Sequence, residues 1–223
     1  ALAARHGAQM PLMVACFDQT LEVIFNGEAG QFSTGHQRHI LARRPLGASN
    51  LGAALRWAAG LKTHRRVLLV SDGVATMGET SSAELRRRVK RLKPGMDRID
   101  ALMVGGIRDE PLLRALVSDT LTNDGVLLDS QKLTTEQMVA RLGQAALSGV
   151  EVEVPGARWI WPSVLTGVQP GDEVLLYADL PAEALTIGRP LTVKLAGPAP
   201  QTLRVPLQNT ERPPLERAWI KAR

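Results

Sequence analysis

A short apolar run at residues 67–70 ends at Ser71-Asp72-Gly73. Runs of this length that are partly β-branched and bounded by a turn are typical of a strand buried on both faces of a sheet. The pattern therefore predicts a central parallel strand that carries the carboxylate of Asp72 at its carboxyl end. Ligands bind at that end of the strands in open α/β sheets.

Strand-like and helix-like patterns alternate through the first two thirds of the chain. Two neighbouring runs, residues 10–17 and 21–25, predict an antiparallel hairpin, because only a short polar segment separates them. Residues 31–48 are polar and basic and are predicted to be irregular. Further strands are predicted at residues 67–71, 99–104 and 125–128, and helices at residues 51–59, 81–93, 109–117 and 134–142. The alternation predicts a parallel sheet with helices on both faces and the hairpin at one edge.

The pattern changes after residue 148. Residues 151–154 alternate with period two, and later apolar runs at residues 173–178, 191–195 and 202–205 are separated by prolines and glycines. Short strands with this spacing are typical of an all-β unit. The sequence therefore predicts an α/β domain over residues 1–148 and a β-rich segment over residues 149–223.

Composition narrows the classes of function only a little. The hydrophobic content of 44% supports a real core, and no apolar stretch approaches the roughly 20 residues needed to span a membrane. The net charge of +5 is too small to indicate a nucleic-acid partner. Cys16 is the one cysteine and is interpreted as a small buried hydrophobe rather than a nucleophile.

Three segments, residues 46–55, 67–73 and 97–106, resemble the von Willebrand factor type A domain in their order and spacing. The resemblance is to the bacterial, VIT-associated version related to inter-alpha-trypsin inhibitor heavy chains, in which a β segment like residues 149–223 follows the A domain. It implies a Rossmann-like sheet, mostly parallel with one antiparallel edge strand, flanked by helices and followed by a small all-β appendage. It also implies a non-enzymatic protein-binding or adhesion module.

The same resemblance implies a metal-ion-dependent adhesion site for Mg²⁺, or for Mn²⁺ or Ca²⁺, built from three loops. By resemblance, Asp72 is the aspartate of the third loop and Ser49 stands where the second loop has a threonine. Asn50, Ser71 and Glu79 would lie at the rim. Such a site holds the cation with hydroxyls and a carboxylate acting through water, and it leaves one coordination position open. An acidic side chain of a protein partner would fill that position and complete the coordination of the cation.

One part of the family's site is missing from the sequence. No Asp-x-Ser-x-Ser segment occurs, and the residues before Met10 are interpreted as the end of a first helix. The first strand and first loop would then lie before Ala1, so the chain is expected to be a fragment or to have lost that strand. Two strand edges would be left unpaired inside the fold. A cation is expected in the intact protein, and both a loaded and a metal-free state stay open for this chain.

Other interpretations of the same residues remain open. The chain could be a metal-free structural fragment whose sheet is completed by another segment or chain. A Mg²⁺-dependent hydrolase using Asp72 is disfavoured, because no second acid is nearby and no Gly-rich phosphate loop is present. Asp72 could instead bond to the backbone of its own turn, and Ser49 could cap a helix together with Asn50.

The sequence says little about cellular context. No nucleic-acid partner is indicated, and membrane association would need segments outside this chain. The family resemblance alone suggests the cell envelope or the exterior, and the compartment, the partner and the oligomeric state stay open.

Overall fold

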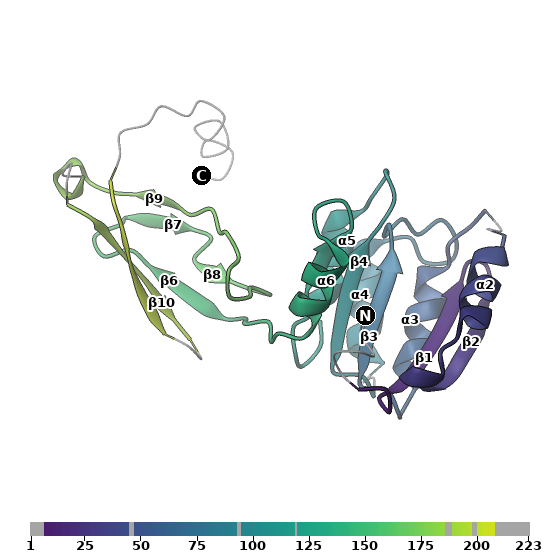
Figure 1. Cartoon of the computed structure of the whole chain (residues 1–223). Helices are drawn as coiled ribbons and strands as arrows, with labels where there is room; N and C mark the ends of the chain where they lie inside the picture. The colour runs from purple at the N-terminus through teal and green to yellow at the C-terminus, as the bar shows by residue number, and fades with distance from the viewer. Residues whose placement is uncertain are drawn as a thin grey trace. The chain divides into compact units, whose positions relative to one another are not determined.

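The structure is a computed structural model. It describes residues 7–44, 47–92, 95–118, 120–185, 189–197 and 200–207. The chain divides into two compact units, Ala1–Ala146 and Leu147–Arg223. Each unit has a hydrophobic core of its own, and Figure 1 labels the elements of both.

The centre of the first unit is a three-stranded parallel sheet. Its order is β3-β4-β5, with β3 at Arg66–Ser71, β4 at Arg98–Met103 and β5 at Leu127–Asp129. One face packs against α3 (Leu51–Gly60), α4 (Ser82–Arg91) and α5 (Glu110–Val117), and the other against α6 (Thr135–Leu142). Alternation along β4 divides the two cores, because Ile99, Ala101 and Met103 face one side and Leu102 the other. The α/β fold class is therefore confirmed.

The sequence predicts the helices α5 and α6 well. Asp109 caps α5 by accepting the N–H of Leu112 at 2.9 Å. The predicted inward positions of that helix are all buried, namely Leu112, Leu113, Leu116 and Val117. Thr134 begins α6 with a capping box that includes Gln137. Local capping and the 3.6-residue period agree in both helices, which is why these elements could be predicted.

A buried carboxylate joins the strands of the parallel sheet. Asp100 in β4 is fully buried and accepts bonds from Arg66 Nε at 2.6 Å and from the Arg98 guanidinium at 2.8 Å. It also accepts the N–H of Val126, just before β5, at 3.0 Å. Arg66 donates a further bond to the carbonyl of Leu142 at the end of α6. Asp100 and Arg66 together thus connect β3 and β4 with the start of β5 and the end of α6.

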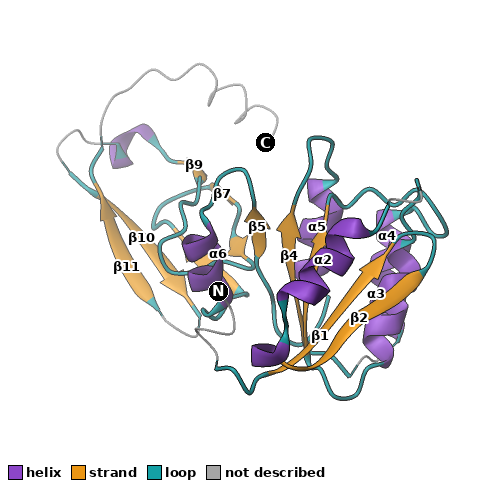
Figure 2. Cartoon of the chain, turned by 45° about the vertical axis from the view of Figure 1, so that its right-hand side comes forward, coloured by secondary structure: helices purple, strands orange, loops and turns teal. Residues whose placement is uncertain are grey.

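The hairpin consists of β1 (Pro11–Phe17) and β2 (Leu21–Glu28), which pair antiparallel as predicted. Within the described residues it forms a two-stranded sheet of its own and is not hydrogen-bonded to β3. Figures 1 and 2 show the hairpin as a separate ribbon beside the helices of the first unit. The sequence predicts that the hairpin forms the edge of one mixed sheet with the parallel strands, and this pairing is not observed among the described residues.

The prediction that residues 67–70 are buried on both faces is wrong. Leu69 is 6% exposed and packs under α3, α4 and α5, but Leu68 is 36% and Val70 is 52% exposed. The strand is also at the edge of the parallel sheet and not at its centre. The physical reason is that α6 packs over β4 and β5 on the second face and does not extend over β3.

The prediction that residues 31–48 are irregular is also wrong. A short turn, η1 (Ala29–Gln31), leads into the helix α2 (Thr34–Ala42). The His36 ring accepts the N–H of Ser33 at 3.0 Å and stacks on Phe32, while His39 lies 3.0 Å from Glu22. The helix has no fully buried residue, so its sequence carries no strong apolar stripe. The two histidines thus have separate partners.

The second unit is all-β, as its sequence pattern predicts. Its four-stranded sheet has the order β11-β10-β6-β8, and its core is centred on Val150, Val152, Val154, Leu165 and Val193. These strands are β6 (Val150–Glu153), β8 (Val164–Leu165), β10 (Leu191–Ala196) and β11 (Gln201–Val205). A second pair is β7 (Trp159–Trp161) with β9 (Tyr177–Asp179), followed by the turn η2 (Ala182–Ala184). Across the described parts of both units, no helix has the length and apolarity to span a membrane.

Candidate functional site

A pocket of about 450 Å³ lies at the carboxyl ends of β1 and β3. Phe17 and Asp18 line it from the end of β1, Ser49 from the loop before α3, and Asp72 and Thr76 from the loop after β3. The structure therefore brings the two predicted site residues, Ser49 and Asp72, to the same pocket. The position agrees with the general rule for ligand sites in open α/β sheets.

Asp72 is half-buried and is held by its own turn. Its Oδ1 accepts the N–H of Val74 at 2.9 Å, while its carbonyl accepts the N–H of Asp109 at 2.8 Å. The turn needs glycine at position 73, where φ is +82° and an added Cβ would lie 2.8 Å from the carbonyl oxygen of Asp109. Ser71 also serves this turn, because its hydroxyl accepts the N–H of Gly73 at 3.0 Å. The Oδ2 atom of Asp72 bonds to no other described residue, so it is the oxygen that a ligand could use.

Ser49 is fixed to the loop after β3 by its backbone. Its N–H donates to the hydroxyl of Thr76 at 2.8 Å, and its carbonyl accepts the N–H groups of Thr76 and Met77, each at 3.1 Å. The cap of α3 is Asn50, whose Oδ1 accepts the N–H of Ala53 at 3.0 Å. The Ser49 hydroxyl is therefore not used as a cap, and it bonds to no other described residue.

The pocket also contains an ion pair that sequence reasoning missed. Asp18 is buried and lies 2.7 Å from the guanidinium of Arg43. The N–H of Thr20 bonds to the Asp18 carboxylate at 2.9 Å, and this bond, followed by Arg43, lowers the pKa of Asp18 below its ordinary value. The carbonyl of Asp18 accepts the N–H of Asn50 at 2.8 Å, which fixes the end of β1 against the start of α3. Arg43 is 25 residues away in the segment predicted as irregular, so no local signal linked the pair.

Cys16 lines the same pocket without the features of a nucleophile. It is half-buried, and burial raises the pKa of its thiol above the ordinary value. A nucleophilic cysteine needs the opposite shift. Its environment therefore suits the structural interpretation.

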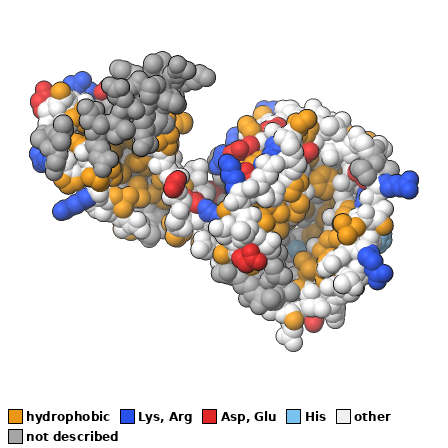
Figure 3. Space-filling model, turned by 45° about the horizontal axis from the view of Figure 1, so that its top comes forward, with side chains coloured by type: hydrophobic (Ala, Val, Ile, Leu, Met, Phe, Trp, Pro, Cys, Tyr) orange, Lys and Arg blue, Asp and Glu red, His pale blue; other side chains and the backbone are white. Residues whose placement is uncertain are grey.

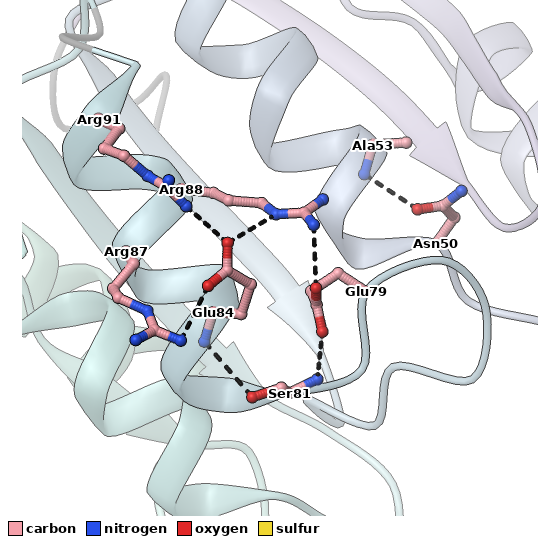
Figure 4. Close-up of polar contacts among 8 residues, drawn as sticks. All are labelled: Asn50, Ala53, Glu79, Ser81, Glu84, Arg87, Arg88 and Arg91. Atoms are coloured by element: carbon pink, nitrogen blue, oxygen red, sulfur yellow. Dashed lines mark hydrogen bonds and ion pairs between the residues drawn. The ribbon is translucent and has the colours of Figure 1, made fainter.

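Glu79, expected at the rim, is engaged elsewhere. Its carboxylate accepts the N–H of Ser81 at 2.9 Å and pairs with Arg88 at 3.0 Å. Figure 4 shows that Arg88 also binds Glu84, which in turn pairs with Arg87 and Arg91 of α4. The arginines, Arg88 foremost, lower the pKa of Glu84. Glu79 is thus part of the α4 surface and does not line the pocket.

The oxygen atoms in the pocket are too few for a magnesium site by themselves. Mg²⁺ requires about six oxygen ligands in near-octahedral geometry. Asp72 and Ser49 offer one free oxygen each, and the remaining carboxylate, Asp18, is already paired with Arg43. No group of three or more His, Cys, Asp or Glu side chains able to hold a metal ion exists among the described residues. The residues present do not fit the cation without further ligands.

The structure is similar to a solved structure described as von Willebrand factor type A from Catenulispora acidiphila. The TM-score is 0.48 and the sequence identity is 16%, over 92% of this chain and 59% of that chain. The present chain thus spans just over half the length of that protein. No family model matches the sequence, and none of the curated proteins does.

Proposed function

We propose that this chain is a non-enzymatic protein-interaction module whose binding surface includes the pocket at the ends of β1 and β3. The observation that carries the proposal is that Ser49 and Asp72 line one pocket from two loops that main-chain hydrogen bonds fix to one another. Such loops present polar groups in a fixed geometry to a partner. Histidine is absent from the described lining of the pocket, and the thiol of Cys16 has a raised pKa. The pocket therefore offers neither a histidine base nor an activated thiol for catalysis.

We extend the proposal to a divalent cation in the intact protein. Mg²⁺, Mn²⁺ or Ca²⁺ would be held by Asp72 and Ser49, with further oxygen ligands from outside the described residues. An acidic side chain of the partner would then complete the coordination. The support is that Asp72 and Ser49 line the same pocket, and that neither the Oδ2 atom of Asp72 nor the hydroxyl of Ser49 bonds to another described residue. The shortage of other ligands predicts that this chain binds cations weakly by itself.

Calorimetric titration with Mn²⁺ tests this proposal. The chain should give weak, saturable heat that the Asp72→Ala variant loses and that Glu153→Ala, an exposed carboxylate in the second unit, retains. Identical titrations for the unchanged chain and Asp72→Ala would contradict coordination by this residue.

A hydrolysis assay addresses the enzymatic alternative. A small phosphate monoester with Mg²⁺ should show no turnover that depends on Asp72. Turnover abolished by Asp72→Asn would contradict the non-enzymatic assignment and support the hydrolase.

A further inference from the structure

A groove of about 330 Å³ lies between α3 and α4 and shares no lining residue with the pocket at β1 and β3. Leu55, Leu85 and Val89 give it an apolar lining, and each of them is at most 3% exposed. Leu92, directly after α4, also lines the groove and is 42% exposed. The groove therefore offers apolar contacts to a ligand.

Arginines lie on both sides of this apolar lining. Arg56 lines the groove from α3, and Arg88 and Arg91 line it from α4. All three residues are exposed, and Figure 4 shows Arg88 extending from α4 toward α3. Arg56 forms no ion pair with another described residue. We call this surface, with its apolar lining and its three arginines, the basic groove.

Carboxylates beside the basic groove neutralise only part of its charge. Glu84 is shared by three arginines of α4 at 2.6–3.2 Å, and Glu79 pairs with Arg88 at 3.0 Å. Arg56 has no such partner among the described residues, so guanidinium groups outnumber carboxylates here. On the face of the first unit in Figure 3, by comparison, Lys and Arg side chains occur at separate places, some of them beside Asp or Glu. The basic groove thus combines an excess of positive charge with an apolar lining.

This combination favours an acidic helix over other anionic partners. Guanidinium groups bind carboxylates in a bidentate geometry, and an amphipathic helix can lay its apolar face into a hydrophobic groove. A nucleic acid has no side chains to fill the apolar lining, and Glu79 and Glu84 would repel its phosphates. A broad lipid surface would meet the exposed arginines but would not reach the buried Leu55 and Leu85.

We propose that the basic groove binds an acidic amphipathic helix of a partner protein. Leucine-sized side chains one turn apart on this helix contact the apolar lining. Carboxylates on either side of them pair with Arg56 of α3 and with Arg88 and Arg91 of α4. Opposite charges steer the helix to the groove, and the apolar contacts hold it there. The binding uses neither Ser49 nor Asp72, so it stands or falls separately from the proposed function.

Fluorescence anisotropy with a labelled synthetic helix tests the proposal. The probe is a peptide of about 18 residues, with leucines spaced three and four positions apart and glutamates on both sides of this stripe. A matched peptide has glutamine in place of each glutamate. At low salt the full chain should bind the acidic peptide at least about tenfold more tightly than the glutamine peptide, and high salt should remove most of the difference. Equal affinities, or no saturable binding of the acidic peptide, would overturn the proposal.

Three variants locate the binding. Arg56→Glu reverses the charge on the α3 side and should weaken binding of the acidic peptide about tenfold. Arg38→Glu changes an exposed arginine of α2 outside the basic groove, and as the matched control it should leave binding unchanged. Leu92→Asp removes the exposed apolar contact and should weaken binding as well, whereas Asp72→Ala should bind normally. Equal losses for Arg56→Glu and Arg38→Glu would show unspecific charge attraction and would overturn the proposal.

Sedimentation with vesicles that contain phosphatidylserine separates a helix from a lipid surface. Any association of the chain with these vesicles should respond equally to Arg56→Glu and Arg38→Glu, because it would depend on net charge alone. A greater loss for Arg56→Glu would assign the basic groove to a membrane surface and would overturn the proposal.

Discussion

At the scale of single residues, hydrogen bonding decides which side chains of the pocket are available to a ligand. Asp18 is surrounded by Arg43 and the N–H of Thr20, whereas one oxygen of Asp72 and the hydroxyl of Ser49 are free of such bonds to described residues. Sequence reasoning selected Asp72 and Ser49 through family resemblance. Sequence reasoning could not decide whether Asp18 is available to a ligand, because a turn aspartate has the same sequence signal whether or not an arginine packs on it.

Lowering the pH should weaken the hydrogen bond and ion pair that Asp18 makes at the turn between β1 and β2. The pKa of Asp18 is lowered from its ordinary value of 3.8, so its bonds stabilise the fold fully above that value. This stability is lost as the pH falls through the lower, folded-state pKa. The Thr20 amide chemical shift, followed by NMR in a pH titration, should change with a midpoint below 3.8. Asp18→Asn should remove the transition, and a midpoint at or above the ordinary value would contradict the assignment.

The helix cap gives a second prediction at this scale. Asn50→Ala should cost about 1 kcal/mol in the free energy of unfolding, because the N–H of Ala53 loses its acceptor. Ser49→Ala, the matched control at the neighbouring position, should change it by only a few tenths of that amount. Urea unfolding of both variants measures the difference, and equal losses would show that the Ser49 hydroxyl also has a structural role.

At the scale of elements, the sequence predicts those whose contacts are local and misses those whose contacts are distant. The stripe of α5 and its Asp109 cap lie within a few residues of one another, so both could be predicted. The helix α2 is stabilised by Phe25 and Glu22 of the hairpin, and its own sequence does not show this. The exposure of Val70 depends on whether another element covers β3, which no local pattern reports.

The buried ion pairs of Asp100 with Arg66 and Arg98 should contribute strongly to the free energy of unfolding of the first unit. Asp100→Ala leaves Arg66 and Arg98 without their buried partner, and it should cost about 3–5 kcal/mol. The matched control is Asp97→Ala, which removes an ion pair with the largely exposed Arg65 and should cost about 1 kcal/mol or less. Chemical denaturation distinguishes them, and a small loss for Asp100→Ala would show that the arginines find other acceptors.

At the scale of the whole molecule, the two units have separate cores and should unfold separately. Asp100→Ala should lower only the transition of the first unit. Val152→Ala, which leaves a cavity in the core of the second unit, should lower only the other, by about 2 kcal/mol. Scanning calorimetry with both variants measures this. A single transition that both substitutions shift would contradict independent unfolding.

The two-sided arrangement of β3 has a consequence for how its sequence can vary. The side chains of Val67 and Leu69 pack in the core under the helices, whereas those of Leu68 and Val70 are more exposed. A library selected for folding should therefore keep positions 67 and 69 apolar and tolerate threonine or serine at 68 and 70. The tolerance profile over the six codons of β3 should alternate with a period of two, and DNA sequencing of the survivors measures it.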